Sequence, residues 1–196
     1  MITLASTSAA RAAMLEAAGV TFTAVASGVD EEVVKLGMAA AKAPPDDVAD
    51  ALAEIKAVTV SRRLPGLVLG ADQVLVTADG TLLDKPTDRA VAEAQLRQLA
   101  GTEHRLETAA VIAEDGRPVW RANESAKLTM RALSDAFVAD YLDREGEAVL
   151  ACVGCYRIEG LGAQLFTRVE GDPFVIQGLP LLEVLDYLRV RGELAG

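Results

Sequence analysis

Apolar residues along this chain gather either in short runs or in rows spaced three and four residues apart, with glycine, proline and acidic residues between them. Short runs are typical of buried strands, and spaced rows are typical of helices with one apolar face. The runs predict strands at residues 2–5, 20–25 and 67–69. The rows and their capping residues predict helices at residues 9–18, 44–63, 87–99, 134–142 and 181–191. The pattern therefore predicts mixed helix and sheet.

The stretch from residue 67 to 86 combines strands with charged groups. Leu67–Leu69 suit a buried strand, and Gly70-Ala71 removes side-chain bulk just before Asp72. We expect this carboxylate at the edge of a strand, where backbone and ligand approach closely. Asp79-Gly80 lies between two apolar segments and predicts a tight hairpin turn, after which Lys85 follows. An acid and a cation about a hairpin apart are typical of a functional site.

A second antiparallel pair is predicted further along. Residues 104–113 alternate enough to be a strand, and Glu114-Asp115-Gly116 predicts a turn into another strand from Val119. His104 is the only histidine, and we expect it to pack or to form a hydrogen bond rather than to act as a general base.

Two of the predicted helices have assignable apolar faces. In the helix at 44–63 the face includes Val48, Leu52 and Ile55, and Lys56 is the kind of residue that is usually solvated. In the helix at 87–99 the residues expected on one face are Ala90, Ala94, Leu96 and Leu99.

Two polar segments each have two interpretations. The hydroxyl-rich turn Ser6-Thr7-Ser8 precedes a helix whose first turn holds Arg11, so it is either an anion site or a plain serine cap with a surface arginine. The acids Asp30, Glu31 and Glu32 follow Gly28, and they form either a solvated loop, which we favour, or part of a divalent cation site.

Length and charge narrow the class of protein. The 196 residues fit one domain, 1–196, with two lobes, and 51% hydrophobic residues give enough apolar surface for a core. The net charge of −10 argues against general binding of nucleic acid. No apolar run approaches the roughly 20 residues of a membrane span, and no basic segment precedes the first apolar residues. We therefore expect a cytoplasmic protein with no membrane partner.

The two cysteines form one CxxC pair, Cys152 and Cys155. A redox pair of this kind usually begins a helix after a strand, whereas the neighbours Ala151, Val153 and Tyr156 suggest a strand. We expect reduced, structural cysteines, although a redox function is an alternative. One CxxC and one histidine are too few ligands for a closed zinc site.

Five ordered motifs together resemble the Maf family of nucleoside triphosphate pyrophosphatases, first associated with septum formation in bacteria. The motifs are Leu4–Ser8 with Arg11, Gly70–Asp72, Lys85-Pro86, Leu96–His104 and Gly178–Leu181.

The resemblance runs from residue 3 to about residue 190 and implies an α/β fold of the inosine-triphosphatase kind. Such a fold has a mixed curved sheet, flanking helices and two lobes around a cleft, and the protein is a possible homodimer. The implied reaction hydrolyses the bond between the α- and β-phosphates of a nucleoside triphosphate, with Mg²⁺, Mn²⁺ or Co²⁺ as cofactor.

The resemblance also implies roles for individual residues. The residues with implied catalytic roles are Arg11, Lys56, Asp72 and Lys85. The implied metal ligands are Glu31 and Asp72, and the implied substrate-binding residues are Ser6, Ala10, Gln73 and Glu159. These residue types suit the reaction, because a polyanionic phosphate needs cations and the attacking water needs a carboxylate.

Three positions bear on which base is accepted. Gln73 and Glu159 match the branch of the family that resembles 7-methyl-GTP pyrophosphatases, whereas Ala10 stands where that branch has tryptophan. A carboxylate can accept hydrogen bonds from both donors of a guanine edge, and uracil or thymine suits a glutamine better. The sequence favours 7-methyl-GTP, with a dTTP- or UTP-preferring enzyme or a nucleotide-binding regulator of cell division as alternatives.

Overall fold

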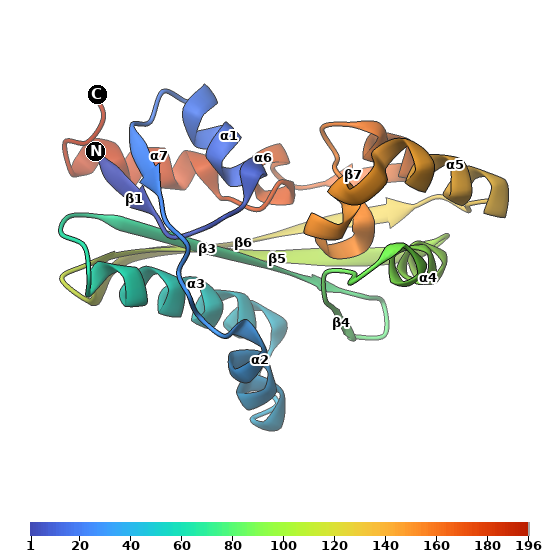
Figure 1. Ribbon diagram of the computed structural model, residues 1–196, viewed down its shortest axis with the longest axis horizontal. Helices are drawn as coiled ribbons and strands as arrows, with labels where there is room; N and C mark the ends of the chain where they lie inside the picture. Colours follow the sequence, from blue (N-terminus) through green and yellow to red (C-terminus); the bar gives the residue numbers. More distant parts are fainter. Residues whose placement is uncertain (196) are drawn as a thin grey trace. The chain divides into compact units, whose positions relative to one another are not determined.

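The computed structural model describes residues 1–195, which form two compact units (Figure 1). Within the described residues, unit 1 comprises 1–73, 108–124 and 178–195, and unit 2 comprises 74–107 and 125–177. Strands β3, β5 and β6 contribute residues to both units. No helix among the described residues is long and apolar enough to cross a membrane.

Seven strands pair into one mixed sheet in the order β2-β1-β3-β5-β6-β7, with β4 paired to β3. Their bounds are β1 Ile2–Leu4, β2 Phe22–Ala24, β3 Val68–Val76, β4 Leu82–Leu83, β5 Glu103–Glu114, β6 Arg117–Met130 and β7 Phe166–Glu170. β1 lies parallel to β2 and β3, whereas the β3–β4 and β6–β7 pairs are antiparallel. The predicted α/β class with a mixed sheet and flanking helices is confirmed.

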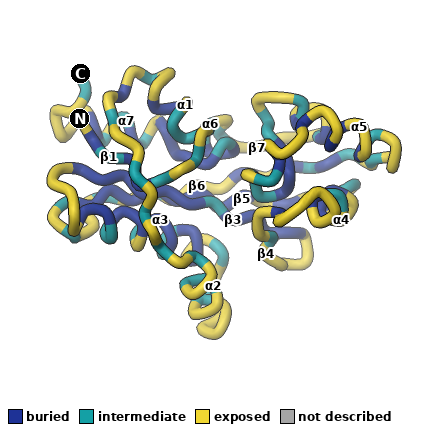
Figure 2. The backbone as a smooth tube through the Cα atoms, in the orientation of Figure 1, coloured by how far each residue is buried: buried dark blue, intermediate teal, exposed yellow. Residues whose placement is uncertain are grey.

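In unit 1, helices cover both faces of the strands. They are α1 Ala9–Ala17, α2 Glu31–Ala40, α3 Pro45–Ser61 and α7 Leu181–Val190. Figure 1 shows α3 on one side of β3, and α1 and α7 on the other. Helix α2 has no buried residue and is drawn in the colours of intermediate and exposed residues in Figure 2. Unit 1 therefore holds β3 between two helical layers.

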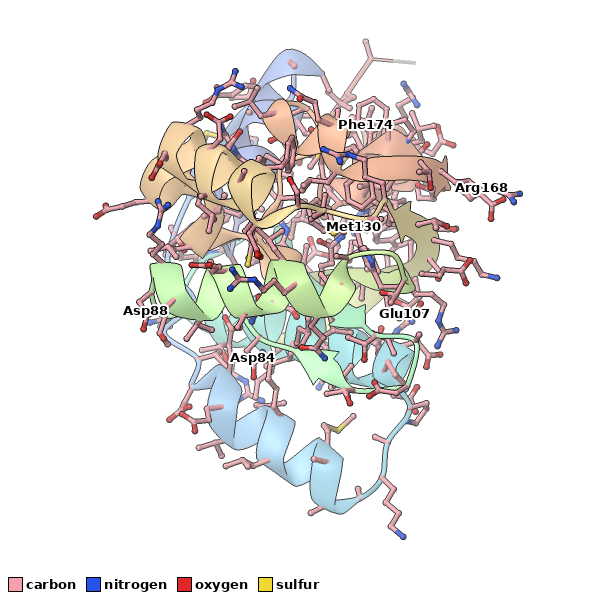
Figure 3. All side chains as sticks on the ribbon, turned by 90° about the vertical axis from the view of Figure 1, so that its right-hand side faces the viewer. Asp84, Asp88, Glu107, Met130, Arg168 and Phe174 are labelled. Atoms are coloured by element: carbon pink, nitrogen blue, oxygen red, sulfur yellow. The ribbon has the colours of Figure 1, made fainter. Side chains whose placement is uncertain are left out.

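In unit 2, helices and short turns surround the remaining strand segments. The elements are α4 Arg89–Leu99, α5 Asp135–Glu145, α6 Pro173–Ile176 and the 3-10 turns η1 Gly146–Ala151, η2 Val153–Cys155 and η3 Leu161–Leu165. Their core is built mainly from leucine, valine and aromatic side chains, including Leu96, Leu142 and Tyr156. In Figure 3, Asp88 lies at the start of α4, where its carboxylate accepts a hydrogen bond from Val91 N at 2.9 Å.

Both hairpin turns are confirmed. Leu75 pairs with Leu83 across β3 and β4, and the turn between them includes Gly80 at φ +87°. Asp115 and Gly116 both adopt positive φ between β5 and β6, the conformation that a two-residue hairpin turn requires.

Several local expectations are wrong. Asp72 lies within the continuous strand β3 rather than at its edge, although the pairing of β3 with β1 ends at Leu69. The cysteine segment is not a strand, because Gly154 and Cys155 adopt φ of +73° and +62° and the chain turns there. Asp30, Glu31 and Glu32 form no loop: Asp30 caps α2, and an aspartate cap followed by acids is a favourable helix start.

The apolar face of α4 is also shifted from the expected one. Ala90 and Ala94 are exposed, and the buried residues are Ala92, Gln95, Leu96 and Leu99. This set has the helical spacing of i, i+3, i+4 and i+7, so a glutamine takes a place in the core-facing row.

Candidate active site

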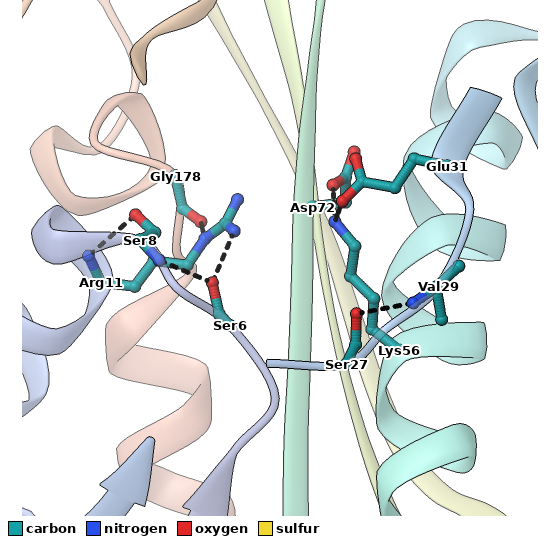
Figure 4. A network of polar contacts seen from close by, with 9 residues as sticks. All are labelled: Ser6, Ser8, Arg11, Ser27, Val29, Glu31, Lys56, Asp72 and Gly178. Carbon is teal, nitrogen blue, oxygen red and sulfur yellow. Dashed lines mark hydrogen bonds and ion pairs between the residues drawn. The ribbon is translucent and has the colours of Figure 1, made fainter. Parts of the chain in front are cut away.

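Two carboxylates of unit 1, on α2 and β3, form ion pairs with one ammonium group on α3 (Figure 4). Lys56 Nζ lies 2.5 Å from Asp72 Oδ1 and 2.8 Å from Glu31 Oε1. The Lys56 and Asp72 side chains are 8% and 9% exposed, whereas that of Glu31 is 43% exposed. The expectation of a solvated lysine is wrong, and the implied residues Glu31, Lys56 and Asp72 form a single ion-pair cluster.

The backbone of unit 1 explains why Lys56 reaches Asp72. A Cβ atom at Gly70 would lie 2.3 Å from Ala53 O and 2.7 Å from Ala57 N, so only glycine lets α3 approach β3 this closely. Lys56 lies between Ala53 and Ala57 on the buried side of α3. The bulk missing at Gly70 thus makes room for a helix of the protein itself.

The turn between β1 and α1 orients Arg11. Ser6 Oγ accepts hydrogen bonds from Ser8 N at 3.1 Å and from Arg11 Nη1 at 3.3 Å, and Ser8 Oγ caps the helix by accepting from Arg11 N. Arg11 Nε donates to Gly178 O at 2.7 Å, which joins the first and last motifs of the chain. Ser8 is therefore the cap, and Arg11 is held in place rather than extended into solvent.

Charges in unit 1 act on one another. The half-buried guanidinium of Arg11 has a lowered pKa because of desolvation, and the carboxylates of Asp72 and Glu31 oppose that shift. Arginine keeps its proton in proteins, so Arg11 is a cation at this site. Ala10, the second residue of α1, is half-buried beside it and presents only a methyl group.

Gln73 is oriented by a residue that the sequence analysis missed. Its Nε2 donates a hydrogen bond to Thr108 Oγ1 at 2.8 Å, and Thr108 on β5 is 1% exposed. A polar residue in the inward row of a strand, between Leu106 and Ala110, is the sequence signal that could have identified it.

The other two implied residues belong to unit 2. Lys85 is exposed in the segment between β4 and α4, and Glu159 is exposed in the segment after η2. Both act on the thiol of Cys152, whose pKa is raised by burial and by Glu159 and is lowered by Arg157 and Lys85. The electrostatic environment of Cys152 therefore includes both Lys85 and Glu159.

Three residues with possible chemistry, one histidine and two cysteines, have structural roles instead. His104 is buried, and its Nε2 lies 2.9 Å from the Tyr156 hydroxyl, which confirms the expected packing and hydrogen bonding. Cys152 and Cys155 are free thiols, as expected, and burial raises the pKa of Cys155 to about 12. A thiol with so high a pKa is a weak nucleophile at neutral pH.

Within residues 1–195, no group of three or more histidine, cysteine, aspartate or glutamate side chains forms a ready metal cage. Glu31 and Asp72 nevertheless direct carboxylate oxygens to one point, now taken by the Lys56 ammonium. One or two carboxylates completed by substrate oxygens are the usual protein ligands of Mg²⁺. The donor set thus suits a hard divalent cation that arrives with a phosphate.

Comparisons with known proteins show the family of the chain. A family model described as "Maf-like protein" matches residues 1–191. A protein of Paramagnetospirillum magneticum named nucleoside triphosphate pyrophosphatase is 56% identical over 192 residues, covering 97% of this chain and 98% of the relative. One of the same name from Caulobacter vibrioides is 53% identical over 193 residues, covering 98% and 96%. The chain belongs to the Maf family.

Proposed function

We propose that this protein is a nucleoside triphosphate pyrophosphatase, which hydrolyses the α–β phosphate bond to release nucleoside monophosphate and pyrophosphate. The observation that carries the proposal is the buried Asp72 carboxylate, fixed by Lys56 in the unit that also holds Arg11 on its serine turn. The names of the relatives support the same reaction.

Four residues of the chain have separate roles in the proposed hydrolysis. Asp72 orients the attacking water and accepts its proton, because a fixed carboxylate is a suitable general base. Arg11 stabilises negative charge that develops on the phosphates, with Ser6 holding its guanidinium in place. Lys56 keeps the Asp72 side chain in one position, and Lys85 supplies a further cation to the leaving pyrophosphate.

A divalent cation, Mg²⁺, Mn²⁺ or Co²⁺, completes this proposal. Glu31 and Asp72 would hold it together with phosphate oxygens. Such a cation neutralises phosphate charge and makes a bound water more acidic.

Replacing Asp72 by Asn tests the reaction. We expect kcat to fall by about a hundredfold or more, because general-base catalysis contributes roughly that much. The variant should fold, since Lys56 keeps its ion pair with Glu31. The measurement is release of pyrophosphate and monophosphate from a panel of nucleoside triphosphates.

Glu32→Gln is the matched control, because Glu32 is an exposed acid in the same helical turn as Glu31 and should leave kcat unchanged. A near-normal kcat for Asp72→Asn would remove Asp72 from the mechanism. Release of single phosphate would contradict the proposed bond, and binding without hydrolysis would favour a nucleotide-binding regulator.

For the base, we propose a preference for 7-methyl-GTP, read by Glu159. N7-methylation adds positive charge to guanine, which an exposed carboxylate favours while it accepts from the guanine edge. Gln73, steadied by Thr108, is the second specificity residue. The small Ala10 offers no aromatic surface, so stacking from this position does not contribute.

Replacing Glu159 by Gln should shift the preference toward UTP or dTTP. A hydrogen bond to a charged group contributes about 1.5–3 kcal/mol, so the ratio of kcat/KM values for 7-methyl-GTP and UTP should fall about tenfold or more. Glu147→Gln, an exposed acid elsewhere in unit 2, is the control. An unchanged ratio would leave the dTTP- or UTP-preferring enzyme as the better assignment.

A further inference from the structure

Gln95 is a buried amide that joins two separate segments of unit 2. Its Nε2 donates to Asp84 O at 2.8 Å, and its Oε1 accepts from the Cys155 thiol at 3.1 Å. Asp84 immediately precedes Lys85, and Cys155 lies four residues before Glu159. Figure 3 shows Asp84 in the chain that leads to α4. One side chain thus contacts the neighbours of both implied site residues of this unit.

Both hydrogen bonds are costly to lose. Gln95 is 8% exposed and Cys155 is fully buried, so water cannot replace either partner easily. A buried polar group left without a hydrogen-bond partner is strongly unfavourable. The thiol remains protonated at neutral pH because burial raises its pKa to about 12, and it therefore stays a donor to the amide oxygen.

The backbone at Cys155 needs such support. Its φ of +62° is a left-handed conformation that residues other than glycine rarely adopt. Cys155 O accepts a hydrogen bond from the Tyr141 hydroxyl at 3.0 Å, and Cys155 N donates to Cys152 O at 3.3 Å. Together with the thiol contact to Gln95, these bonds hold the residue at which the chain turns toward Glu159.

The far side of the same segment is fixed separately. Arg157 Nε and Nη2 both donate to Glu145 Oε2, at 3.0 and 2.8 Å, and the Glu145 side chain is 2% exposed. Gly162 packs against the backbone of Arg157, where a Cβ atom would lie 2.4 Å from the carbonyl oxygen. The segment from 152 to 162 is therefore anchored at both ends, and Gln95 links it to Asp84, the residue before Lys85.

We propose that Gln95 is a positioning residue that fixes the Lys85 segment relative to the Glu159 segment, so that the cation and the base-reading carboxylate act at a set spacing. The proposal rests on the proposed function for the roles of Lys85 and Glu159, and the link itself does not depend on them. It predicts that disturbing Gln95 changes base discrimination as well as stability.

The test compares variants that remove or keep the link. Gln95→Met and Cys155→Ala remove it, whereas Cys155→Ser keeps a hydrogen-bond donor. We expect Gln95→Met to lower kcat/KM for 7-methyl-GTP by about 10- to 100-fold, since displacements near 1 Å can have effects of that size. The further effect of Glu159→Gln on the base ratio should shrink to less than about twofold in this background. Cys155→Ser should stay within about threefold of wild type, and Cys155→Ala should resemble Gln95→Met.

Thr102→Val is the matched control. It removes the 2.8 Å hydrogen bond from Thr102 Oγ1 to Leu99 O, at the end of the same helix, without touching either segment. It should lower Tm but leave the base ratio unchanged. A changed ratio in this control, or an unchanged one in folded Gln95→Met, would overturn the proposal. If Gln95→Met does not fold, the Cys155→Ala and Cys155→Ser pair decides in the same way.

Amide hydrogen exchange provides a readout that does not need turnover. In Gln95→Met and Cys155→Ala, exchange should rise in both segments, residues 82–88 and 152–160. A rise in neither or in only one segment would refute the link. If the wild-type protein hydrolyses no nucleotide, the proposed function fails, and the exchange measurement still decides whether Gln95 joins the segments.

Discussion

At the scale of single residues, Lys56 is buried only because two carboxylates meet it. An ammonium removed from water without partners is strongly unfavourable, and its ion pairs with Asp72 and Glu31 offset that cost. Removing Lys56 leaves two carboxylates without their cation, and removing either carboxylate leaves the ammonium with one partner in place of two. The cluster therefore behaves as a unit, and the effects of its substitutions should not be additive.

His104 makes stability depend on pH. Burial lowers its pKa from 6.5 to about 4. Its Nδ1 is buried without a hydrogen-bond partner among the described residues, so a proton bound there would have no acceptor. Between pH 6.5 and 4 the unfolded chain binds a proton that the folded protein does not. The contribution of His104 to stability is therefore complete above pH 6.5 and is lost as the pH falls toward 4. The expected loss is about 3 kcal/mol.

Urea denaturation at pH 7, 6, 5 and 4.5 measures this dependence. Carboxylates also contribute to acid destabilisation, so the comparison is with His104→Gln, in which only the imidazole is removed. We expect a flatter decline of unfolding free energy in the variant. Parallel curves for the two proteins would show that His104 does not titrate in this way.

At the scale of elements, the contact of α3 with β3 determines the site. Replacing Gly70 by Ala would place a methyl group against the backbone of α3, 2.3 Å from Ala53 O. The helix must then move away, and overpacking of this kind costs about 1–3 kcal/mol. Because Lys56 belongs to the same helical turn, its ion pair with Asp72 should lengthen. We therefore expect a lower Tm and a lower kcat together.

Gly37→Ala is the control for that substitution. Gly37 lies inside α2, and a Cβ atom there would meet nothing within 4 Å. Alanine in a helix interior is favoured over glycine by roughly 0.5–1 kcal/mol, so this variant should gain stability with unchanged kcat. Equal Tm values for the two variants would contradict the close-approach argument.

Elements with strong local signals could be predicted from the sequence. Capped helices such as α1 and α5 and the hairpin turn at Asp79-Gly80 appear as expected, since their geometry depends on residues within one or two turns. The start of α2 has the same signals at Asp30–Glu32, but without an apolar row that becomes buried the helix went unpredicted.

Tertiary contacts explain the rest of the differences. The rows that contain Lys56 and Gln95 have the spacing of core positions, yet a polar residue in such a row is assigned to solvent unless its partners are known. Those partners, Glu31 and Asp72 for the lysine and Asp84 and Cys155 for the glutamine, come from distant parts of the chain. The residue types therefore indicated which residues belong to the site, but the ion pairs and hydrogen bonds among them could be identified only from the folded structure.

At the scale of the whole molecule, the distribution of charge poses a problem for a phosphate substrate. The chain carries a net charge of −10, and the cations Arg11 and Lys56 share unit 1 with the carboxylates of Glu31 and Asp72. These four charges cancel, so this cluster alone offers no net attraction for a polyanion. A divalent cation bound with the nucleotide would supply the missing positive charge. We expect a chelator to abolish hydrolysis and added Mg²⁺, Mn²⁺ or Co²⁺ to restore it.

Thermal unfolding tests this charge argument without turnover. In wild type the Lys56 ammonium lies between the two carboxylates, so Mn²⁺ alone should raise Tm little. In Lys56→Met the same oxygens lose their cation and should bind Mn²⁺ more tightly. At about ten times the Kd, binding stabilises by about 1.4 kcal/mol, which corresponds to about 3–6 °C in Tm. Lys127 is an exposed lysine on β6, and Lys127→Met is the control: its Tm should change with Mn²⁺ as that of wild type does. If Lys56→Met gains no more from Mn²⁺ than this control, the two carboxylates do not form the cation site, and the positive charge that the phosphates need must come from other residues.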